Sequence, residues 1–328
     1  MVNSKSVMEL LADIGVYPIP AELSVTNVLK GWFLLIGFVI YICIEIQVAL
    51  WISISSLFVP DSTTVAVSQA VHRFFWTTLI YLVNKRKIRV IISGVDLHDP
   101  IHQELLKNSI ILSNHKSLFD FLLIYYLKTL TEKATSDGIM LSFFNWNNFW
   151  QTPGLAVLWN FMHNDENWEM NIVELEQSLN DLIKQSSNNW IVHFPEVNIC
   201  TEKNRLVQGQ ELDKYFLPRF KDLLYPRFAN FNNLIKVAHN STVSNIRNIV
   251  GLTILYYNPL RNDFFNPTLF EILTLKQPVF IINVDFKLKP LSKLPTKHRK
   301  LEKWLEAEWS EKDKILELMR SQLKLTIE

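Results

Sequence analysis

The chain has 328 residues, with 33 Lys and Arg against 32 Asp and Glu, so its charge gives no reason to expect a nucleic-acid partner. Its two cysteines, Cys43 and Cys200, are too few for a disulfide framework or a zinc cluster and fit a reducing compartment. With 12% aromatic residues and only 8 glycines, the composition disfavours a glycine-rich nucleotide-binding protein and favours contact with lipid.

Residues 1–30 form an N-terminal flank in which acidic residues occur and no basic start leads into a short apolar stretch, so we expect no secretory signal there. A long apolar run then extends from Gly31 to Pro60, interrupted only by Glu45. A helix needs about 20 apolar residues to cross a bilayer. The run is longer than that, which leaves open a tilted spanning helix and a kinked hairpin within one leaflet. A carboxylate at mid-depth is costly, so Glu45 favours the hairpin or a buried partner.

Aromatic residues and a basic cluster follow the apolar run. The cluster contains Lys85, Arg86, Lys87 and Arg89. This pattern is typical of an interfacial helix, and residues 31–87 are therefore predicted to form a membrane segment with such a helix. The excess of basic residues after the run predicts that the rest of the chain faces the cytosol.

Residues 88–290 alternate between short apolar strands and helical stretches, which predicts an α/β domain with a central mixed sheet flanked by helices. "NSIILSN" and "NWIVHFPE" are predicted strands, ending at Asn114 and near Glu196. "SLFDFLLIYYLKTL" is a predicted buried helix, and "MNIVELEQSLNDLIKQ" an amphipathic helix capped by Asn171. Residues 291–328 are highly charged with apolar residues at helical spacing, which predicts an amphipathic helical tail docked on the domain or, failing that, lying on a membrane surface.

His115 follows the first of these strands, and Asp120 falls in the first turn of the next helix. A carboxylate in that turn can fold back onto the imidazole, fix its tautomer and raise the basicity of the other ring nitrogen. A general base that takes a proton from an alcohol needs this arrangement. By spacing alone, a polar turn explains the pair equally well.

The stretch "SNHKSLFD" resembles the N-H-x4-D motif of the glycerolipid acyltransferases, the PlsC-type 1-acylglycerol-3-phosphate acyltransferase superfamily. "HFPEVNICTEKN" resembles that superfamily's second block, phenylalanine-proline-glutamate-glycine-threonine. "LLYPRFANF" and "LPTKHRKLEKWLEAEWSEKDKILE" are similar to the lysocardiolipin and lysophosphatidylinositol acyltransferase branch. The resemblance covers most of the chain.

The resemblance implies a membrane-bound enzyme, expected in the endoplasmic reticulum, that transfers a fatty acyl group from acyl-CoA to the hydroxyl of a lysophospholipid. His115 would be the general base and Asp120 its orienting partner. Asn114, Glu196, Asn198 and Arg227 are the expected substrate-binding residues. No metal and no cofactor are implied; the partners are acyl-CoA as co-substrate, the acceptor and membrane lipid.

The chain departs from that family at positions that face the acceptor. Val197 and Asn198 replace the glycine and threonine of the second block, and a β-branched residue resists the unusual backbone angles that glycine allows. Glu166 stands where the family usually has arginine, and Asn230 replaces a glycine, a mild change because Asn tolerates the left-handed region. Lys203 and Arg205 are further candidate phosphate ligands, although solvated surface charges explain them at least as well.

Two hypotheses therefore remain from the sequence. The intact Asn114, His115 and Asp120 favour an active acyltransferase. Val197, Asn198 and Glu166 favour a catalytically weak or inactive homologue that binds lipid and acts as a regulatory protein. A soluble hydrolase using the same pair is disfavoured by the membrane run and by the lack of a serine motif.

Overall fold

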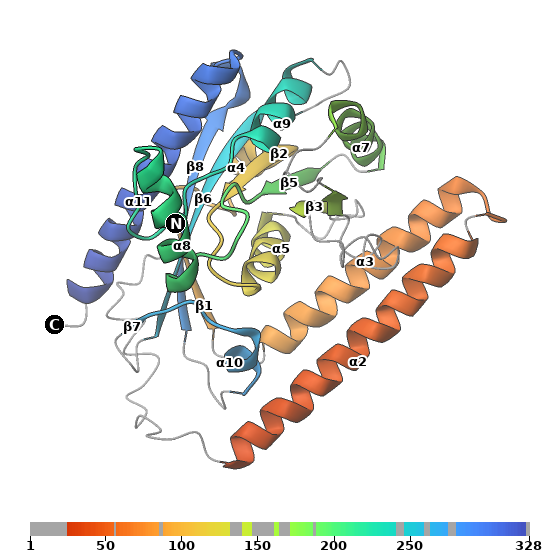
Figure 1. Cartoon of the computed structure of the whole chain (residues 1–328). Helices are drawn as coiled ribbons and strands as arrows, with labels where there is room; N and C mark the ends of the chain where they lie inside the picture. The colour runs from red at the N-terminus through yellow and green to blue at the C-terminus, as the bar shows by residue number, and fades with distance from the viewer. Residues whose placement is uncertain are drawn as a thin grey trace.

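A computed structural model describes residues 25–55, 57–84, 88–131, 140–145, 161–163, 171–185, 188–240, 246–258, 263–274 and 280–325. A central sheet carries helices on both faces, and a pair of long helices runs along one side of it (Figure 1). The chain is thus a mixed α/β protein with one strongly apolar N-terminal helix, as the sequence predicts.

The sheet has eight strands: β1 (Ile88–Ser93), β2 (Ser109–Ser113), β3 (Met140–Asn145), β4 (Phe161–His163), β5 (Asn189–His193), β6 (Asn248–Asn258), β7 (Asp263–Phe264) and β8 (Phe280–Pro290). Their order is β1-β8-β6-β2-β5-β3-β4, with β7 added antiparallel to β6. From β6 to β4 neighbouring strands are parallel, whereas β8 is antiparallel to β6 and parallel to β1. Because β2 lies between β6 and β5 and parallel to both, the carboxyl ends of these three strands meet at one edge of the sheet.

One face of the sheet is covered by α7 (Ile172–Gln185), α9 (Ala229–Asn240) and α11 (His298–Leu325), and the other face by α5 (Phe119–Thr131). Side chains along β2 alternate between the two cores, with Ile110 in the first and Ile111 in the second, as strand geometry requires. Asn171 caps α7, because its Oδ1 accepts a 2.9 Å hydrogen bond from the N–H of Val173. The sheet domain also contains α4 (Pro100–Leu106), α8 (Glu202–Lys214), α10 (Leu269–Thr274) and the 3-10 turn Leu291–Lys293.

The C-terminal tail forms the single helix α11, and its apolar stripe docks on the sheet. Leu305, Trp309 and Leu316 are all fully buried in the first core. Docking of the tail on the domain is therefore confirmed.

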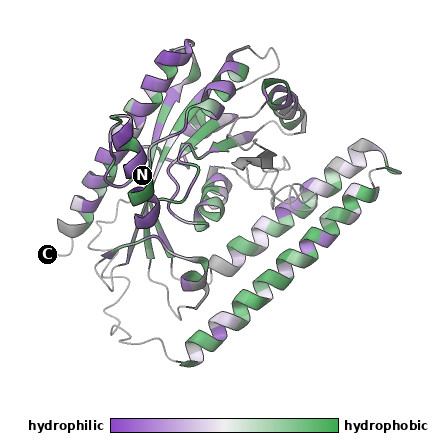
Figure 2. Ribbon diagram, viewed as in Figure 1, coloured by the Kyte–Doolittle hydropathy of each residue, from purple (hydrophilic) through white to green (hydrophobic). Residues whose placement is uncertain are grey.

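The apolar N-terminal run forms α2 (Val25–Ser55), which turns back into α3 (Asp61–Asn84). Helix α2 contacts α3 and α10, and its residues are mostly hydrophobic along its length (Figure 2). Many of its apolar side chains are exposed, among them Phe33 and Trp51. Glu45, within α2, is buried, with 5% of the residue exposed. By its length and composition, Val28–Ser55 could cross a bilayer.

Candidate active site

Asn114 turns the chain off the sheet at the end of β2. Its Oδ1 accepts from the N–H of Ile254 on β6 at 2.8 Å, and its Nδ2 donates to the carbonyl of the same residue at 3.0 Å. The side-chain amide thus extends the β2–β6 ladder, which ends at the Ser113–Leu252 pair, by one more step. Asn114 is fully buried with both polar groups engaged, so in this structure it orients the loop that follows.

His115 and Asp120 are brought together by that loop, as the spacing predicts. The Nδ1 atom of His115 lies 3.0 Å from Oδ2 of Asp120. The same oxygen accepts the N–H groups of Lys116 and Ser117 at 2.6 and 2.9 Å. A carboxylate is acceptor-only, so Nδ1 carries the hydrogen and Nε2 keeps its lone pair. Nε2 is therefore the ring nitrogen that can take a proton from a substrate.

The imidazole is buried and packs against two aromatic rings. The rings of Phe194 and Phe121 lie 4.5 and 5.5 Å from it, centroid to centroid. The side chain of His115 is 8% exposed and that of Asp120 is not exposed at all. Water is thus largely kept from the pair, which strengthens the electrostatic interaction between them.

Glu196 lies in the turn after β5, and its carboxyl group lies beside the backbone of His115. Its Oε2 accepts the N–H of Leu224 at 3.2 Å, and the backbone N–H of His115 faces the same carboxyl group. Burial raises the pKa of Glu196 to about 8, against the opposing effects of Lys116 and the two N–H donors. Because the residue is 1% exposed, its carboxyl holds two loops together from within the protein.

Val197 adopts a left-handed backbone with φ of 69°. This conformation costs a residue with a Cβ about 1–2 kcal/mol relative to glycine. The backbone at Val197 therefore has a conformation that glycine adopts easily, and the energetic cost of the valine side chain remains there as strain. Asn198 follows on the surface, with its N–H donating to the carbonyl of Glu196 at 2.7 Å.

Arg227 lies beside this turn, because its N–H donates to the carbonyl of Pro195 at 2.8 Å. Its side chain is exposed, as are those of Lys203 and Arg205 on α8. The guanidinium of Arg205 donates to the carbonyl of Lys221.

At two further positions where the chain differs from the motifs that it resembles, the structure shows no consequence. Asn230 lies in the first turn of α9 and is not among the described residues with positive φ, so the missing glycine has no conformational consequence there. Glu166 lies outside the described residues.

Several contacts of the site have no local sequence signal, because each joins segments that lie far apart in the chain. The hydroxyl of Tyr256 on β6 donates to Oδ1 of Asp120 at 2.5 Å. Lys116 donates its ammonium to the carbonyl of Asp222, and the hydroxyl of Ser117 donates to the carbonyl of Pro267 at 2.5 Å. Only the register of the sheet and the packing of the loops reveal them.

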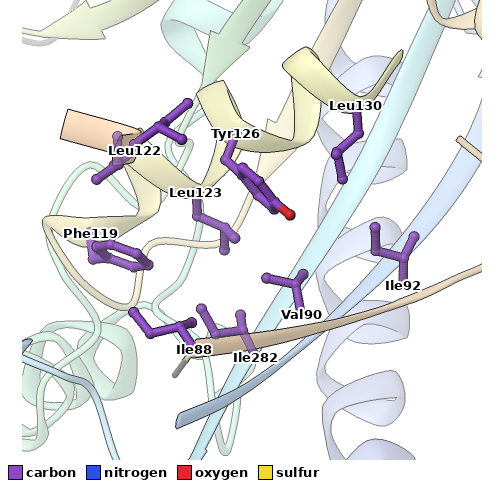
Figure 3. Close-up of a pocket in the computed structure, with 10 residues that line it drawn as sticks. Ile88, Val90, Ile92, Phe119, Leu122, Leu123, Tyr126, Leu130 and Ile282 are labelled. Atoms are coloured by element: carbon purple, nitrogen blue, oxygen red, sulfur yellow. The ribbon is translucent and has the colours of Figure 1, made fainter. Parts of the chain in front are cut away.

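An apolar cavity of about 130 Å³ lies between β1 and α5 (Figure 3). Its wall includes Phe119, the residue before Asp120, together with Leu122, Leu123, Tyr126, Leu130, Val90 and Ile92. The cavity thus lies on the same helix as Asp120 and offers an apolar ligand mainly side-chain carbon.

The raised pKa of Glu196 predicts a pH-dependent stability. Its folded pKa of about 8 exceeds the ordinary value of 4.5, so the carboxyl stabilises the fold fully below pH 4.5, and that stability is lost as the pH rises through 8. Glu196→Gln keeps an acceptor oxygen without a charge. The wild type therefore loses stability as the pH rises and the variant does not. The unfolding free energy of Glu196→Gln minus that of the wild type should increase by about 2–4 kcal/mol between pH 5 and 9.

Denaturant unfolding of both proteins in one detergent, at several pH values, measures this difference. Glu202→Gln, at an exposed position in the first turn of α8, is the control and should follow the wild type. A difference between Glu196→Gln and wild type that stays constant from pH 5 to 9 would contradict the assignment.

Comparison of the chain with models of known protein families finds no match, and a search of curated proteins finds no significant relative. Within the residues that the structure describes, no group of three or more His, Cys, Asp and Glu side chains is placed to hold a metal ion.

Proposed function

We propose that the chain is a membrane-attached acyltransferase that moves a fatty acyl group from acyl-CoA to the hydroxyl of a lysophospholipid, of the lysophosphatidic acid or lysophosphatidylinositol type. The observation that carries the proposal is the enclosed His115–Asp120 pair at the carboxyl ends of parallel strands, backed by the turn that contains Glu196. The resemblance of both segments to the two PlsC-type motifs supplies the reaction class.

In the proposed reaction, Nε2 of His115 takes the proton of the acceptor hydroxyl as its oxygen attacks the thioester carbonyl carbon. The carbon–sulfur bond then breaks, and the departing CoA sulfur takes the proton back from the imidazolium. Asp120 stabilises the imidazolium through Nδ1 while it exists. Transfer is direct, so no acyl-enzyme forms.

The two substrates are assigned to different features. The exposed guanidinium of Arg227, whose backbone is bonded to Pro195, is the proposed ligand of the acceptor's phosphate. The apolar cavity beside Phe119 is the proposed site of the acyl chain.

Helix α2 is the proposed membrane attachment. Its exposed face carries large apolar side chains that water solvates poorly, and lipid is a favourable solvent for them. An endoplasmic reticulum location with the catalytic domain in the cytosol, where acyl-CoA arrives, belongs to the same proposal.

The competing hypothesis, an inactive lipid-binding homologue, draws on the strained Val197 and the exposed Asn198 in the second motif. Labelled acyl-CoA, supplied to membranes that contain the protein together with a panel of lysophospholipids, distinguishes the two. The proposal predicts labelled two-chain phospholipid from one class of acceptor. Label that stays in acyl-CoA, or appears only as free fatty acid, would contradict it.

Filling the acyl cavity should change chain-length selectivity. Val90 projects into the cavity from β1 (Figure 3), and phenylalanine there occupies space that a long chain needs. We expect Val90→Phe to lower kcat/KM for long-chain acyl-CoA about tenfold, a loss equal to about 1.4 kcal/mol of binding. The kcat/KM for short-chain acyl-CoA should stay at the wild-type value.

Ile101→Phe, at an exposed position on α4, controls for the added ring. Competition between short- and long-chain acyl-CoA in one reaction gives the ratio directly. An unchanged ratio in Val90→Phe would remove the acyl chain from this cavity.

A further inference from the structure

The two oxygens of the Asp120 carboxylate have different partners. Oδ2 accepts from His115 and from the N–H groups of Lys116 and Ser117. Oδ1 accepts the hydroxyl of Tyr256 at 2.5 Å, the one side-chain donor to that oxygen among the residues that the structure describes. The carboxylate is thus fixed at both ends.

Tyr256 is itself held firmly by strand β6. The residue is 2% exposed, and its ring meets that of Phe119 edge-on, with centroids 6.5 Å apart. Two residues earlier on β6, the backbone of Ile254 forms both hydrogen bonds with the amide of Asn114. One strand therefore fixes the loop at its start, through Asn114, and at its end, through Asp120.

We propose that Tyr256 is a positioning residue, whose hydroxyl holds the Asp120 carboxylate in the plane that aligns His115 for proton transfer; this inference rests on the proposed acyl transfer. A carboxylate held at one oxygen can turn about its last side-chain bond, a torsion with a broad minimum. A donor on Oδ1 removes that freedom, so that Oδ2 stays directed at Nδ1.

The chemistry of the phenol suits this role. Burial, and after it the negative charge of Asp120, raise the pKa of Tyr256 well above its ordinary value, so the hydroxyl remains protonated and can only be a neutral donor. Lys116 in the same loop, Glu196 after β5 and Cys200 are further ionisable groups near the pair. Lys116 donates to the carbonyl of Asp222, Glu196 accepts from Leu224, and the Cys200 thiol faces the carbonyl of Asp222, so none of these contacts involves Oδ1.

Tyr256→Phe removes the hydroxyl and keeps the ring, and Tyr257→Phe is its matched control. Tyr257 is the next residue on β6 and is also fully buried, but it points into the opposite core, where its ring contacts Phe264. Each variant therefore loses one buried phenol oxygen from the same strand. If the two variants have similar unfolding temperatures, an effect seen only in Tyr256→Phe comes from positioning and not from a general loss of stability.

The first measurement does not depend on catalysis. Diethyl pyrocarbonate modifies unprotonated histidine, and mass spectrometry of the peptide that contains His115 gives the pH of half-modification. Without the phenol, the Asp120 carboxylate can turn away from Nδ1 and stabilises the imidazolium less, so the midpoint in Tyr256→Phe should move to lower pH. Tyr257→Phe should keep the wild-type midpoint.

The second measurement is acyl transfer itself. We expect Tyr256→Phe to lower kcat about tenfold, a part of the 10²- to 10⁴-fold that a positioned general base contributes, with KM for both substrates unchanged. An unmoved midpoint in Tyr256→Phe, or one shared with Tyr257→Phe, would overturn the inference. If the variants differ in labelling as expected but the wild type transfers no acyl group, the proposed function is overturned. The positioning of His115 by Tyr256 then still stands.

Discussion

Replacing His115 by alanine is expected to reduce the rate of acyl transfer by about 10²- to 10⁴-fold, the usual contribution of a positioned general base. The variant keeps Asp120 and its bonds to the N–H groups of Lys116 and Ser117, so the loop should hold its shape. Transfer of labelled acyl groups to lysophospholipid measures the loss, and thermal unfolding checks that the protein remains folded.

Cys200 provides the sharpest control for this experiment. Its backbone N–H donates to the carbonyl of His115 at 2.8 Å, so this cysteine, a candidate nucleophile, lies next to the site. Burial raises the pKa of that thiol to about 11, so almost no thiolate is present at neutral pH. Cys200→Ala should therefore retain transfer. Loss of activity in Cys200→Ala with activity kept in His115→Ala would reverse the assignment.

Asp120→Asn should lower kcat by about 10²- to 10⁴-fold while the fold changes little. The amide oxygen can take the place of Oδ2 and accept the same three donors, while the amide nitrogen faces Tyr256, whose hydroxyl can accept as well as donate. Hydrogen bonding is then preserved, but the negative charge that stabilises the imidazolium is lost.

Steady-state rates with a saturating acceptor measure that charge effect, and Asp120→Ala shows the contrast. Alanine leaves the N–H groups of Lys116 and Ser117 without an acceptor, at a cost of about 1–3 kcal/mol in stability for each buried group. Asp120→Asn with nearly full activity would show that the carboxylate serves the fold alone.

Much of the frame could be predicted from the sequence because it depends on local patterns. The strand that ends at Ser113, the buried helix α5 and the capped helix α7 follow from hydrophobic periodicity and from the residue at the helix start. The meeting of His115 with Asp120 follows from a strand–loop–helix order in which the loop is short.

What the sequence could not give depends on contacts between distant segments. Tyr256 reaches Asp120 only because β6 is paired beside β2 in one register, and no spacing in the chain records that. The sequence shows that Val197 resists a left-handed backbone, but only the surrounding turn shows that it adopts one. The buried position of Glu45 likewise depends on how α2 packs on its neighbours.

The central claim is tested most directly by product stoichiometry with purified protein in lipid vesicles. Acyl-CoA and the acceptor identified from the panel are supplied together, and the released CoA thiol and the new phospholipid are counted in the same samples. The account predicts equal amounts of both from the wild type, no thiol release without acceptor, and neither product from His115→Ala. Thiol released with free fatty acid in the absence of acceptor, or identical products from wild type and His115→Ala, would contradict it.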